Sequence, residues 1–305
     1  MPVESKAQDD PLAEFLKMRP RLFGIAYRML GSASEAEDIV QDVWLRWQAA
    51  DRSAVLDPPA FLATTTTRLA INVSQSARVR HETYVGPWLP EPVDTSSDPR
   101  LGAERGEALN FAILLLLEKL SPTERAAYVL REAFDYPYRQ IADILQVEET
   151  NTRQLVTRAR QHIAAGRNKA VSSEEHRRLL EAFIIAAQKG DLATLESLFA
   201  SDVVSYSDGG GVVRTAARAP ISGSERVAKF IGTFAWHFWT SVTVQVVQTN
   251  GQASMLISRD GAPVGLVAIN ASEQGIGQIL WILRPSKLTA IARSPKAETE
   301  TDPHT

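Results

Sequence analysis

Arginines repeat along one short stretch of the chain, ETNTRQLVTRARQHI at residues 149–163, which has no acidic residue after Glu149. The next acid is Glu174, although the chain has 36 Asp and Glu against 33 Lys and Arg. At about 100° per residue, one side of a helix would collect an apolar stripe, formed by Thr152, Leu155, Val156, Ala159 and Ile163. The opposite side would carry guanidinium, amide and hydroxyl groups. This composition predicts a helix whose polar face binds something negatively charged.

Two shorter segments before this helix would position its polar face. LSPTE at residues 120–124 is typical of a helix start, with Ser121 as the cap, Pro122 in the first turn and Glu124 completing a capping box. A second helix over Tyr138–Leu145 is followed by the short turn QVE. A short helix, a tight turn and a longer polar-faced helix form a helix-turn-helix. Any three-helix bundle can show this spacing, and the acid-free face favours the DNA-binding interpretation.

The composition indicates an ordinary globular protein. The 305 residues suffice for about two domains. The absence of cysteine excludes disulfides and thiolate metal sites and fits a reducing cytoplasm. The N-terminus has acids where a signal peptide needs cations, and the longest apolar run, FAILLLL, is too short to span a bilayer. We therefore expect a soluble cytoplasmic protein without a membrane segment.

Charge is sorted by segment along the chain. The net charge of −3 requires any DNA-binding surface to be local. A second window without acids covers residues 58–81 and carries Arg68, Arg78 and Arg80. By contrast, SEAEDIVQD at residues 34–42 would repel DNA, so its acidic face suits a protein partner. Trp44 and Trp47 follow it, and core packing is the simpler explanation for both.

The chain divides into helical segments, a proline-rich connection and a mixed final part. In the first segment, RLFGIAYRMLG predicts a helix that stops at Gly31, and Asp57 before Pro58 and Pro59 predicts the cap of another helix. Residues 84–102 contain Pro87, Pro90, Pro92 and Pro99, which forbid a regular helix. This segment could be a solvated linker, but its apolar residues lead us to expect that part of it docks on a surface. After Val171, two helices precede the strands, and Ser172 with Glu175 predicts a capping box at the start of the first of them. The strands are VVSYS, VVRTA and SVTVQVV, a hairpin with Asp260-Gly261 at its turn, and IGQILWILR. Helices followed by a curved antiparallel sheet predict an α+β domain.

The motifs resemble those of a known family. Residues 12–168 resemble a bacterial sigma factor of the extracytoplasmic-function class. EAEDIVQDVWLRW is similar to the part of its second region that binds the clamp of core RNA polymerase. FLATTTTRLAINVSQSARVRHE sits where the family melts and reads the minus-ten promoter element. The segment from LSPTE to RQHI resembles the fourth region, whose helix-turn-helix reads the minus-thirty-five element.

The rest of the chain resembles one subgroup of that class. WLPEP in the linker, DGGG at residues 208–211 and a final domain similar to the SnoaL-like group of the NTF2-like fold are its marks. In that subgroup the appended domain regulates the sigma factor. Two departures exist: Val212 follows the glycines where a basic residue is usual, and RPSKL stands in place of an NPDKL-like motif.

The resemblance implies a multidomain fold: two all-α sigma domains, the second with a helix-turn-helix, followed by an α+β NTF2-like domain. The expected divisions are residues 1–83 for region 2, 84–106 for the linker, 107–170 for region 4, 171–292 for the SnoaL-like domain and 293–305 for a disordered tail. The expected function is that of an alternative sigma factor, which binds core polymerase and directs promoter-specific initiation under the control of its last domain.

The implied site residues fall into four groups. Core-polymerase binding is expected of Glu37, Asp38, Gln41, Asp42, Leu45 and Arg46. Contacts with minus-ten DNA are expected of Arg68, Asn72, Arg78 and Arg80. The helix-turn-helix would contribute Tyr138, Arg139, Gln140, Thr150, Asn151, Arg153, Gln154, Thr157, Arg158 and Arg160, since Arg pairs with guanine and Gln with adenine. Regulation is expected of Trp88, Leu89, Pro90, Glu91, Pro92, Asp208, Gly209, Gly210, Gly211, Pro285, Lys287 and Leu288.

Two other functions remain open for the last domain. An isomerase- or cyclase-like activity would need a base such as Asp208 or His237, and no second catalytic group is evident. The three glycines after Asp208 are equally explained by a turn that needs positive φ. Trp236, Trp239 and Trp281 could line an effector pocket or fill the core. We expect no enzyme, cofactor or metal, and the alternative is a DNA-binding regulator whose last domain binds a small effector or retains such an activity.

Overall fold

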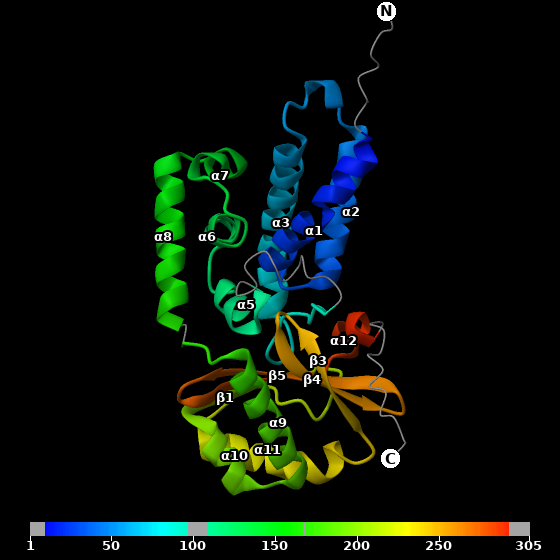
Figure 1. Cartoon of the computed structure of the whole chain (residues 1–305), viewed down its shortest axis with the longest axis vertical. Helices are drawn as coiled ribbons and strands as arrows, with labels where there is room; N and C mark the ends of the chain where they lie inside the picture. Colours follow the sequence, from blue (N-terminus) through cyan, green and yellow to red (C-terminus); the bar gives the residue numbers. More distant parts are fainter. Residues whose placement is uncertain (1–9, 97–108, 167–168, 293–305) are drawn as a thin grey trace, which may run out of the picture.

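The computed structural model describes residues 10–96, 109–166 and 169–292, so the expected tail lies outside the described residues. The first part folds into α1 (Pro11–Leu30), α2 (Ala33–Ala49), the 3-10 turn η1 (Arg52–Ala54) and α3 (Pro58–Glu82) (Figure 1). The α1 helix ends at Gly31, whose φ of 65° is left-handed, as the sequence predicts. Asp57 caps α3 by accepting a hydrogen bond from the Ala60 N–H at 3.0 Å.

The second helical part contains the predicted helix-turn-helix. Its elements are α5 (Phe111–Leu117), α6 (Pro122–Tyr128), the π-helical η3 (Val129–Ala133), α7 (Tyr138–Leu145) and α8 (Glu149–Gly166). The capping box of Ser121 and Glu124 is present, and Gln146 adopts a φ of 56° in the turn between α7 and α8. The buried residues of α8 are the predicted stripe: Thr152, Leu155, Val156, Ala159 and Ile163.

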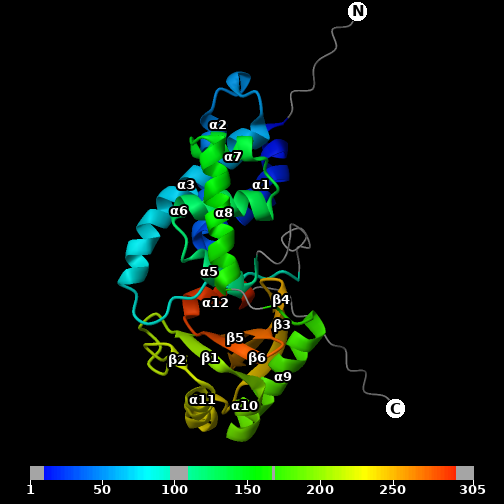
Figure 2. The same cartoon turned by 90° about the vertical axis from the view of Figure 1, so that its left-hand side faces the viewer.

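The two helical parts share one continuous hydrophobic core. Buried arginines hold them together: the Arg125 Nε donates to the Arg28 carbonyl at 2.8 Å, and Arg125 also pairs with Glu118 at 2.6 Å. The Arg28 guanidinium lies 5.0 Å from the centre of the Phe134 ring, within the range of a cation–π contact. The region 2-like and region 4-like helices therefore pack directly against each other (Figures 1 and 2).

The last part combines helices with a mixed sheet. Its helices are α9 (Ser173–Lys189), α10 (Leu192–Leu198), α11 (Ser224–Phe238) and α12 (Pro285–Ala292). Its strands are β1 (Phe199–Asp208), β2 (Ile221–Ser222), β3 (Thr243–Thr249), β4 (Gln252–Arg259), β5 (Ala262–Ser272) and β6 (Gly275–Ile282). The strand order is β2-β1-β6-β5-β4-β3. This architecture bears out the expected α+β class.

Three local expectations were wrong. The sheet is not wholly antiparallel, because β1 pairs with β6 in parallel. VVRTA does not form a strand: the chain turns after the glycines, and the Val213 N–H donates to the Gly209 carbonyl at 3.2 Å. The expected capping box at Ser172 is only half formed, because the Glu175 carboxylate binds Arg178 at 2.6 Å instead of the cap backbone.

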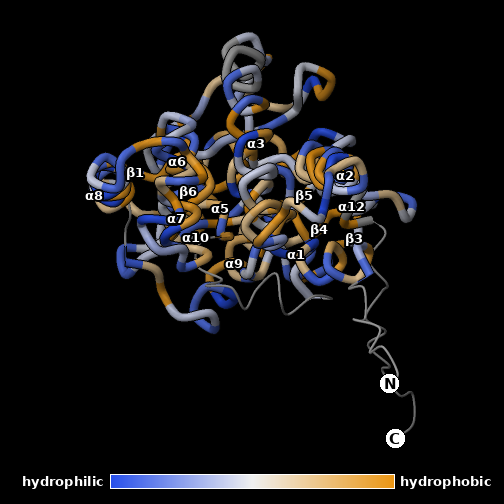
Figure 3. Tube along the Cα trace, turned by 90° about the horizontal axis from the view of Figure 1, so that it is seen from above, coloured by the Kyte–Doolittle hydropathy of each residue, from blue (hydrophilic) through white to orange (hydrophobic). Residues whose placement is uncertain are grey.

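The two faces of the sheet have different neighbours. One face packs against α9, α10 and α11 around a core that includes Phe183, Ile279 and Trp281. The other face packs against α12, the linker residue Leu89 and Phe111 of α5. Figure 2 shows the sheet between α10 and α11 on one side and the helical parts on the other. Along the chain trace, hydrophobic residues gather toward the inside (Figure 3). Among the described residues, no helix is long and apolar enough to cross a membrane.

A buried histidine gives the last domain a predicted pH dependence. His176 of α9 is 4% exposed, its Nε2 lies 3.0 Å from the Ile269 carbonyl, and burial lowers its pKa. The unfolded chain therefore binds this proton more readily than the folded chain below about pH 6.5. The stability from this group is complete above that pH and is lost as the pH falls toward the folded-state pKa.

We expect His176→Gln to flatten the fall in the free energy of unfolding below about pH 6.5, where one proton gives a slope of at most about 1.4 kcal/mol per pH unit. Denaturant unfolding at a series of pH values measures it. His162→Gln, at an exposed position of α8, is the control. An unchanged slope in His176→Gln would show that another group carries the pH dependence.

Candidate functional site

The polar face of α8 is accessible. Of the residues expected to contact DNA from the helix-turn-helix, Tyr138 and Gln140 are half-buried. The others are exposed: Arg139, Thr150, Asn151, Arg153, Gln154, Thr157, Arg158 and Arg160. The Tyr138 ring contacts two guanidinium groups, that of Arg131 at 5.0 Å and that of Arg153 at 4.4 Å from its centre. Tyr138 therefore supports the start of α8 instead of projecting freely from α7.

Carboxylates from other helices lie beside the arginines of α8. Arg158 binds Glu124 at 3.0 Å, and Arg160 binds Glu132 at 2.7 Å. The window without acids in the sequence is therefore not free of acids on the folded surface. Both arginines are about half exposed, whereas the Glu124 and Glu132 side chains are only 15% and 26% exposed. Each guanidinium group therefore keeps one side in solvent while the other side meets a partly buried carboxylate.

The acidic face of α2 is open to a partner. All six residues expected to bind polymerase are exposed: Glu37, Asp38, Gln41, Asp42, Leu45 and Arg46. Leu45 is an exposed apolar residue among them, and Glu37 forms an ion pair with Arg19 at 2.6 Å. Trp47 is buried, with its Nε1 donating to the Pro11 carbonyl, and Trp44 packs on Phe15. Core packing thus explains both tryptophans.

Arg68, near the middle of α3, forms hydrogen bonds within the molecule. Arg68 donates from Nε to the Ile144 carbonyl at 3.1 Å and from a terminal nitrogen to the Asp143 carbonyl at 3.5 Å. These carbonyls end α7, where a helix dipole favours a cation. Asn72 is exposed, while the side chains of Arg78 and Arg80 lie outside the described ones. The surfaces expected to read the two promoter elements therefore meet at Arg68.

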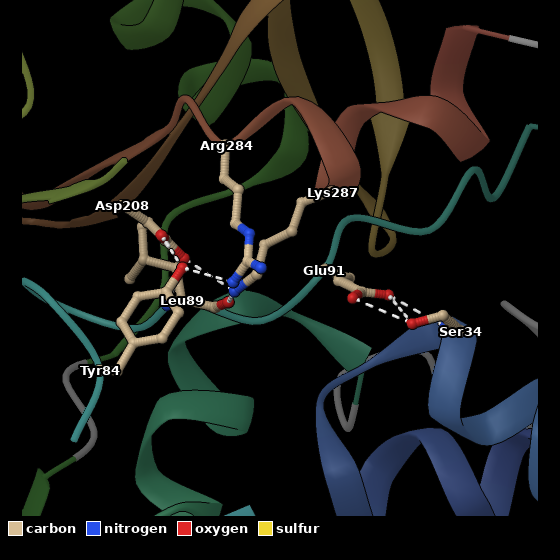
Figure 4. A network of polar contacts seen from close by, with 7 residues as sticks. All are labelled: Ser34, Tyr84, Leu89, Glu91, Asp208, Arg284 and Lys287. Atoms are coloured by element: carbon tan, nitrogen blue, oxygen red, sulfur yellow. Dashed lines mark hydrogen bonds and ion pairs between the residues drawn. The ribbon is translucent and has the colours of Figure 1, made fainter. Parts of the chain in front are cut away.

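The linker is fixed to the last domain by a group of five residues that we name the interdomain lock: Tyr84, Leu89, Asp208, Arg284 and Lys287 (Figure 4). Asp208 is fully buried and pairs with Lys287 at 2.7 Å. It also accepts hydrogen bonds from the Tyr84 hydroxyl at 2.6 Å and the Leu89 N–H at 2.9 Å. Lys287 donates in turn to the Leu89 carbonyl, and Arg284 donates to the Tyr84 hydroxyl at 3.2 Å.

The electrostatics of the lock follow from burial. Burial lowers the pKa of Lys287, and the Asp208 carboxylate opposes that effect. Burial and the hydrogen bond to Asp208 raise the pKa of Tyr84 to about 12, so its hydroxyl stays a donor near neutral pH. Both Asp208 oxygens are occupied by these partners, which leaves Asp208 unsuited to act as a catalytic base.

The same linker segment also binds the region 2-like helices. The Glu91 carboxylate accepts a hydrogen bond from the Ser34 N–H at 3.0 Å (Figure 4). The backbone N–H of Glu91 donates to the Gly31 carbonyl at 2.7 Å. A Cβ on Gly31 would come within 2.6 Å of the Trp88 indole, whose ring also lies 4.5 Å from the Lys287 ammonium. Pro90 and Pro92 are buried as well. WLPEP therefore contacts both the first and the last part of the chain.

The glycine motif supports the lock through its backbone. Gly210 and Gly211 have φ of 57° and 77°, so the turn explanation is confirmed for both. A Cβ on Gly210 would lie 2.9 Å from the Tyr84 hydroxyl, and a Cβ on Gly209 only 2.5 Å from the Cβ of Ala216. In RPSKL, Pro285 begins α12 and Leu288 is buried against the sheet. These motifs, distant in sequence, meet at one place.

Tyr84 and Arg284 of the lock were not among the predicted site residues, and neither was Asn250. Asn250, in the turn between β3 and β4, is fully buried and has a φ of 55°. Its amide nitrogen donates to the Tyr27 hydroxyl at 2.7 Å and to the Leu109 carbonyl at 3.0 Å, and its oxygen accepts from the Val93 N–H at 2.9 Å. The Asn-Gly pair between alternating strands signals a hairpin. Nothing local in the sequence indicates that three other segments cover this turn.

Comparison with known families identifies the two helical parts. Residues 15–80 match the family described as Sigma-70 region 2, and residues 110–163 match the family described as Sigma-70, region 4. These regions, in this order and with the geometry above, define the class as RNA polymerase sigma factors.

Individual relatives narrow the class. The chain is 38% identical over 226 residues to the ECF RNA polymerase sigma factor SigJ of Mycobacterium tuberculosis, covering 72% of each protein. It is 32% identical over 289 residues to a probable ECF RNA polymerase sigma factor SigI of that species, covering 92% of this chain and 96% of the relative. The crystal structure of M. tuberculosis SigJ superimposes with a TM-score of 0.73 at 31% identity, covering 92% of this chain and 98% of the other. The chain belongs to the extracytoplasmic-function (ECF) sigma factors and is an alternative sigma factor that directs transcription, as predicted.

Proposed function

We propose that the last domain holds the sigma unit in a closed arrangement through the linker, and that this arrangement opens when core polymerase and promoter DNA bind. The observation that carries the proposal is the contact of Arg68 with the end of α7, because it joins the two surfaces that would read the promoter. The interdomain lock supports it, since it fixes the segment that connects these surfaces.

The spacing of promoter elements makes the closed arrangement incompatible with reading both at once. Elements at minus ten and minus thirty-five are separated by about 25 base pairs, or roughly 85 Å along B-form DNA. In contrast, the helices that would read them share one core. The α8 helix itself, with 18 residues, is only about 27 Å long. The two helical parts must therefore separate to reach their elements.

The interdomain lock also limits how far the two helical parts can separate. While residues 84–96 remain docked, only residues 97–108 can bridge the gap, and about a dozen residues reach roughly 40 Å when fully extended. Releasing the linker from Tyr84 onward about doubles that reach, to roughly 85 Å. Docking and release of the linker would thus control promoter binding.

Within this proposal, the six exposed residues of α2 bind the polymerase clamp, where the acidic face avoids DNA and Leu45 supplies an apolar contact. On α8, Arg153 and Gln154 contact base edges, and Arg160 contacts phosphate after leaving Glu132. Arg68 joins the DNA-binding residues of α3 once α7 moves away.

The opening can be measured with labels, because the natural chain has no cysteine. We expect a pair of spin labels at Gln48→Cys of α2 and Ala164→Cys of α8 to move apart by tens of ångströms when core polymerase and promoter DNA are added. A pair at Lys17→Cys and Gln48→Cys, both within the first helical part, is the matched control. An unchanged distance in a complex that transcribes would contradict the proposal.

A further inference from the structure

A cavity of about 150 Å³ lies in the last domain, on the face of the sheet that packs against α11. Aromatic side chains dominate its lining: Phe230, Phe234, Phe238, Trp239 and Trp281. Among the described residues, no carboxylate lines it, while His237 and Arg259 are the basic groups that do. Apolar pockets with a few polar groups are typical of small-molecule sites. The linings of the cavity and of the interdomain lock are different sets of residues.

A serine of β1 supplies a polar group to the lining of this cavity. Ser207 is 3% exposed as a residue and lines the cavity. By comparison, the Ser205 hydroxyl, two residues earlier on β1, accepts a hydrogen bond from the Trp281 indole at 3.2 Å. A serine hydroxyl can both donate and accept a hydrogen bond, so Ser207 could bind and orient an oxygen atom of a ligand in this cavity.

The cavity is joined to the interdomain lock through adjacent residues. Successive side chains of a strand point to opposite faces. Ser207 accordingly lines the cavity, whereas the side chain of the neighbouring Asp208 points toward the linker (Figure 4). On β6, Trp281 pairs with Ser207. Leu283 also lines the cavity, and its N–H donates to the Asp208 carbonyl at 2.9 Å. A displacement of β1 or β6 at the cavity would therefore move Asp208 directly.

We propose that this cavity binds a one-ring aromatic molecule with an oxygen-bearing substituent, and that its binding alters the docking of the linker. The ring suits the aromatic lining, and the oxygen suits the Ser207 hydroxyl. The size agrees, since an apolar protein cavity of about 150 Å³ accommodates benzene. The effect on the linker rests on the regulatory role proposed above, whereas the binding itself does not.

Binding is tested on the full chain without polymerase, by titration calorimetry and ligand-detected NMR with benzoate, benzyl alcohol and cyclohexylmethanol. We expect saturable binding of at least one aromatic probe, and affinity at least fivefold lower for the saturated ring. Ser207→Leu, which fills the cavity, should lower the affinity at least tenfold, and the milder Ser207→Ala several-fold. Thr233→Ala on α11, whose exposed hydroxyl does not line the cavity, should bind like the natural chain. Absence of saturable binding, or equal binding by Ser207→Leu, overturns the site.

The connection to the linker is tested by hydrogen exchange of peptides covering residues 84–93, with and without the bound probe. We expect the exchange rate there to change at least threefold, because the Leu89 N–H is bonded to Asp208. Peptides from α2 provide the reference. Binding without any change in the linker peptides overturns the connection while leaving the site. A linker change without an effect on transcription would instead count against the proposed function.

Discussion

Replacing Lys287 by methionine is expected to lower the free energy of unfolding by about 3–5 kcal/mol, the usual effect of removing one partner of a buried ion pair. The Asp208 carboxylate has no contact with solvent, so without Lys287 it would be a buried charge that has lost its cation. The Leu89 carbonyl would lose its donor as well. Since Leu89 belongs to the linker, the same change should loosen the docking of the linker and alter transcription.

Denaturant unfolding of the full chain and run-off transcription with core polymerase measure the two effects. The control is Lys229→Met, which removes an exposed lysine that pairs with Glu225 on the surface of α11. A second variant, Lys287→Met combined with Asp208→Leu, removes both charges and should recover most of the stability, because apolar replacements of a buried ion pair are often tolerated. It should not restore docking of the linker, because the double variant also removes the Asp208 carboxylate that accepts from the Leu89 N–H and the Tyr84 hydroxyl. Equal unfolding of Lys287→Met and Lys229→Met would contradict this account of the lock.

Local chemistry made much of the helical architecture predictable. Helix caps depend on partners only a few residues away, so they can be predicted from sequence. The caps at Gly31, at Asp57 and at the pair Ser121 and Glu124 are examples. The apolar stripe of α8 was likewise predicted, because helical periodicity is a local property. The motifs of the linker and the last domain were found only through a resemblance, which did not indicate their contacts with one another.

Non-local pairing explains what sequence reasoning missed. Arg158 and Glu124 are 34 residues apart, so an acid-free window could not exclude a carboxylate from another helix. The parallel pairing of β1 with β6 joins the two ends of the domain and has no local signature. VVRTA has the β-branched residues of a strand, but the positive φ of Gly210 and Gly211 turns the chain away from the sheet.

Asn250→Ala is expected to have the second largest effect, because this buried amide joins three segments. The substitution would leave the Val93 N–H and the Leu109 carbonyl buried without these partners, at about 1–3 kcal/mol each. The Tyr27 hydroxyl would lose one partner but would still donate to the Glu91 carbonyl at 2.6 Å. Alanine at a φ of 55° adds backbone strain of about 1–2 kcal/mol.

The strain can be separated from the lost hydrogen bonds with a matched variant. Asp260 occupies another hairpin turn, between β4 and β5, with a φ of 51° and an exposed side chain. Asp260→Ala should therefore suffer the strain without burying any unpaired group. We expect Asn250→Ala to lose at least about 2 kcal/mol more in denaturant unfolding than Asp260→Ala.

The same pair of variants distinguishes a general loss of stability from release of the closed arrangement. Asn250 contacts the first helical part through Tyr27, the linker through Val93 and the start of the second helical part through Leu109. Its loss should broaden the distance distribution between labels at Gln48→Cys and Ala164→Cys before any polymerase is added, whereas Asp260→Ala should leave that distribution narrow. Equal losses of stability and equally narrow distributions would mean that the buried amide does not hold the parts together. The closed arrangement would then depend on the interdomain lock and on the core that the helical parts share.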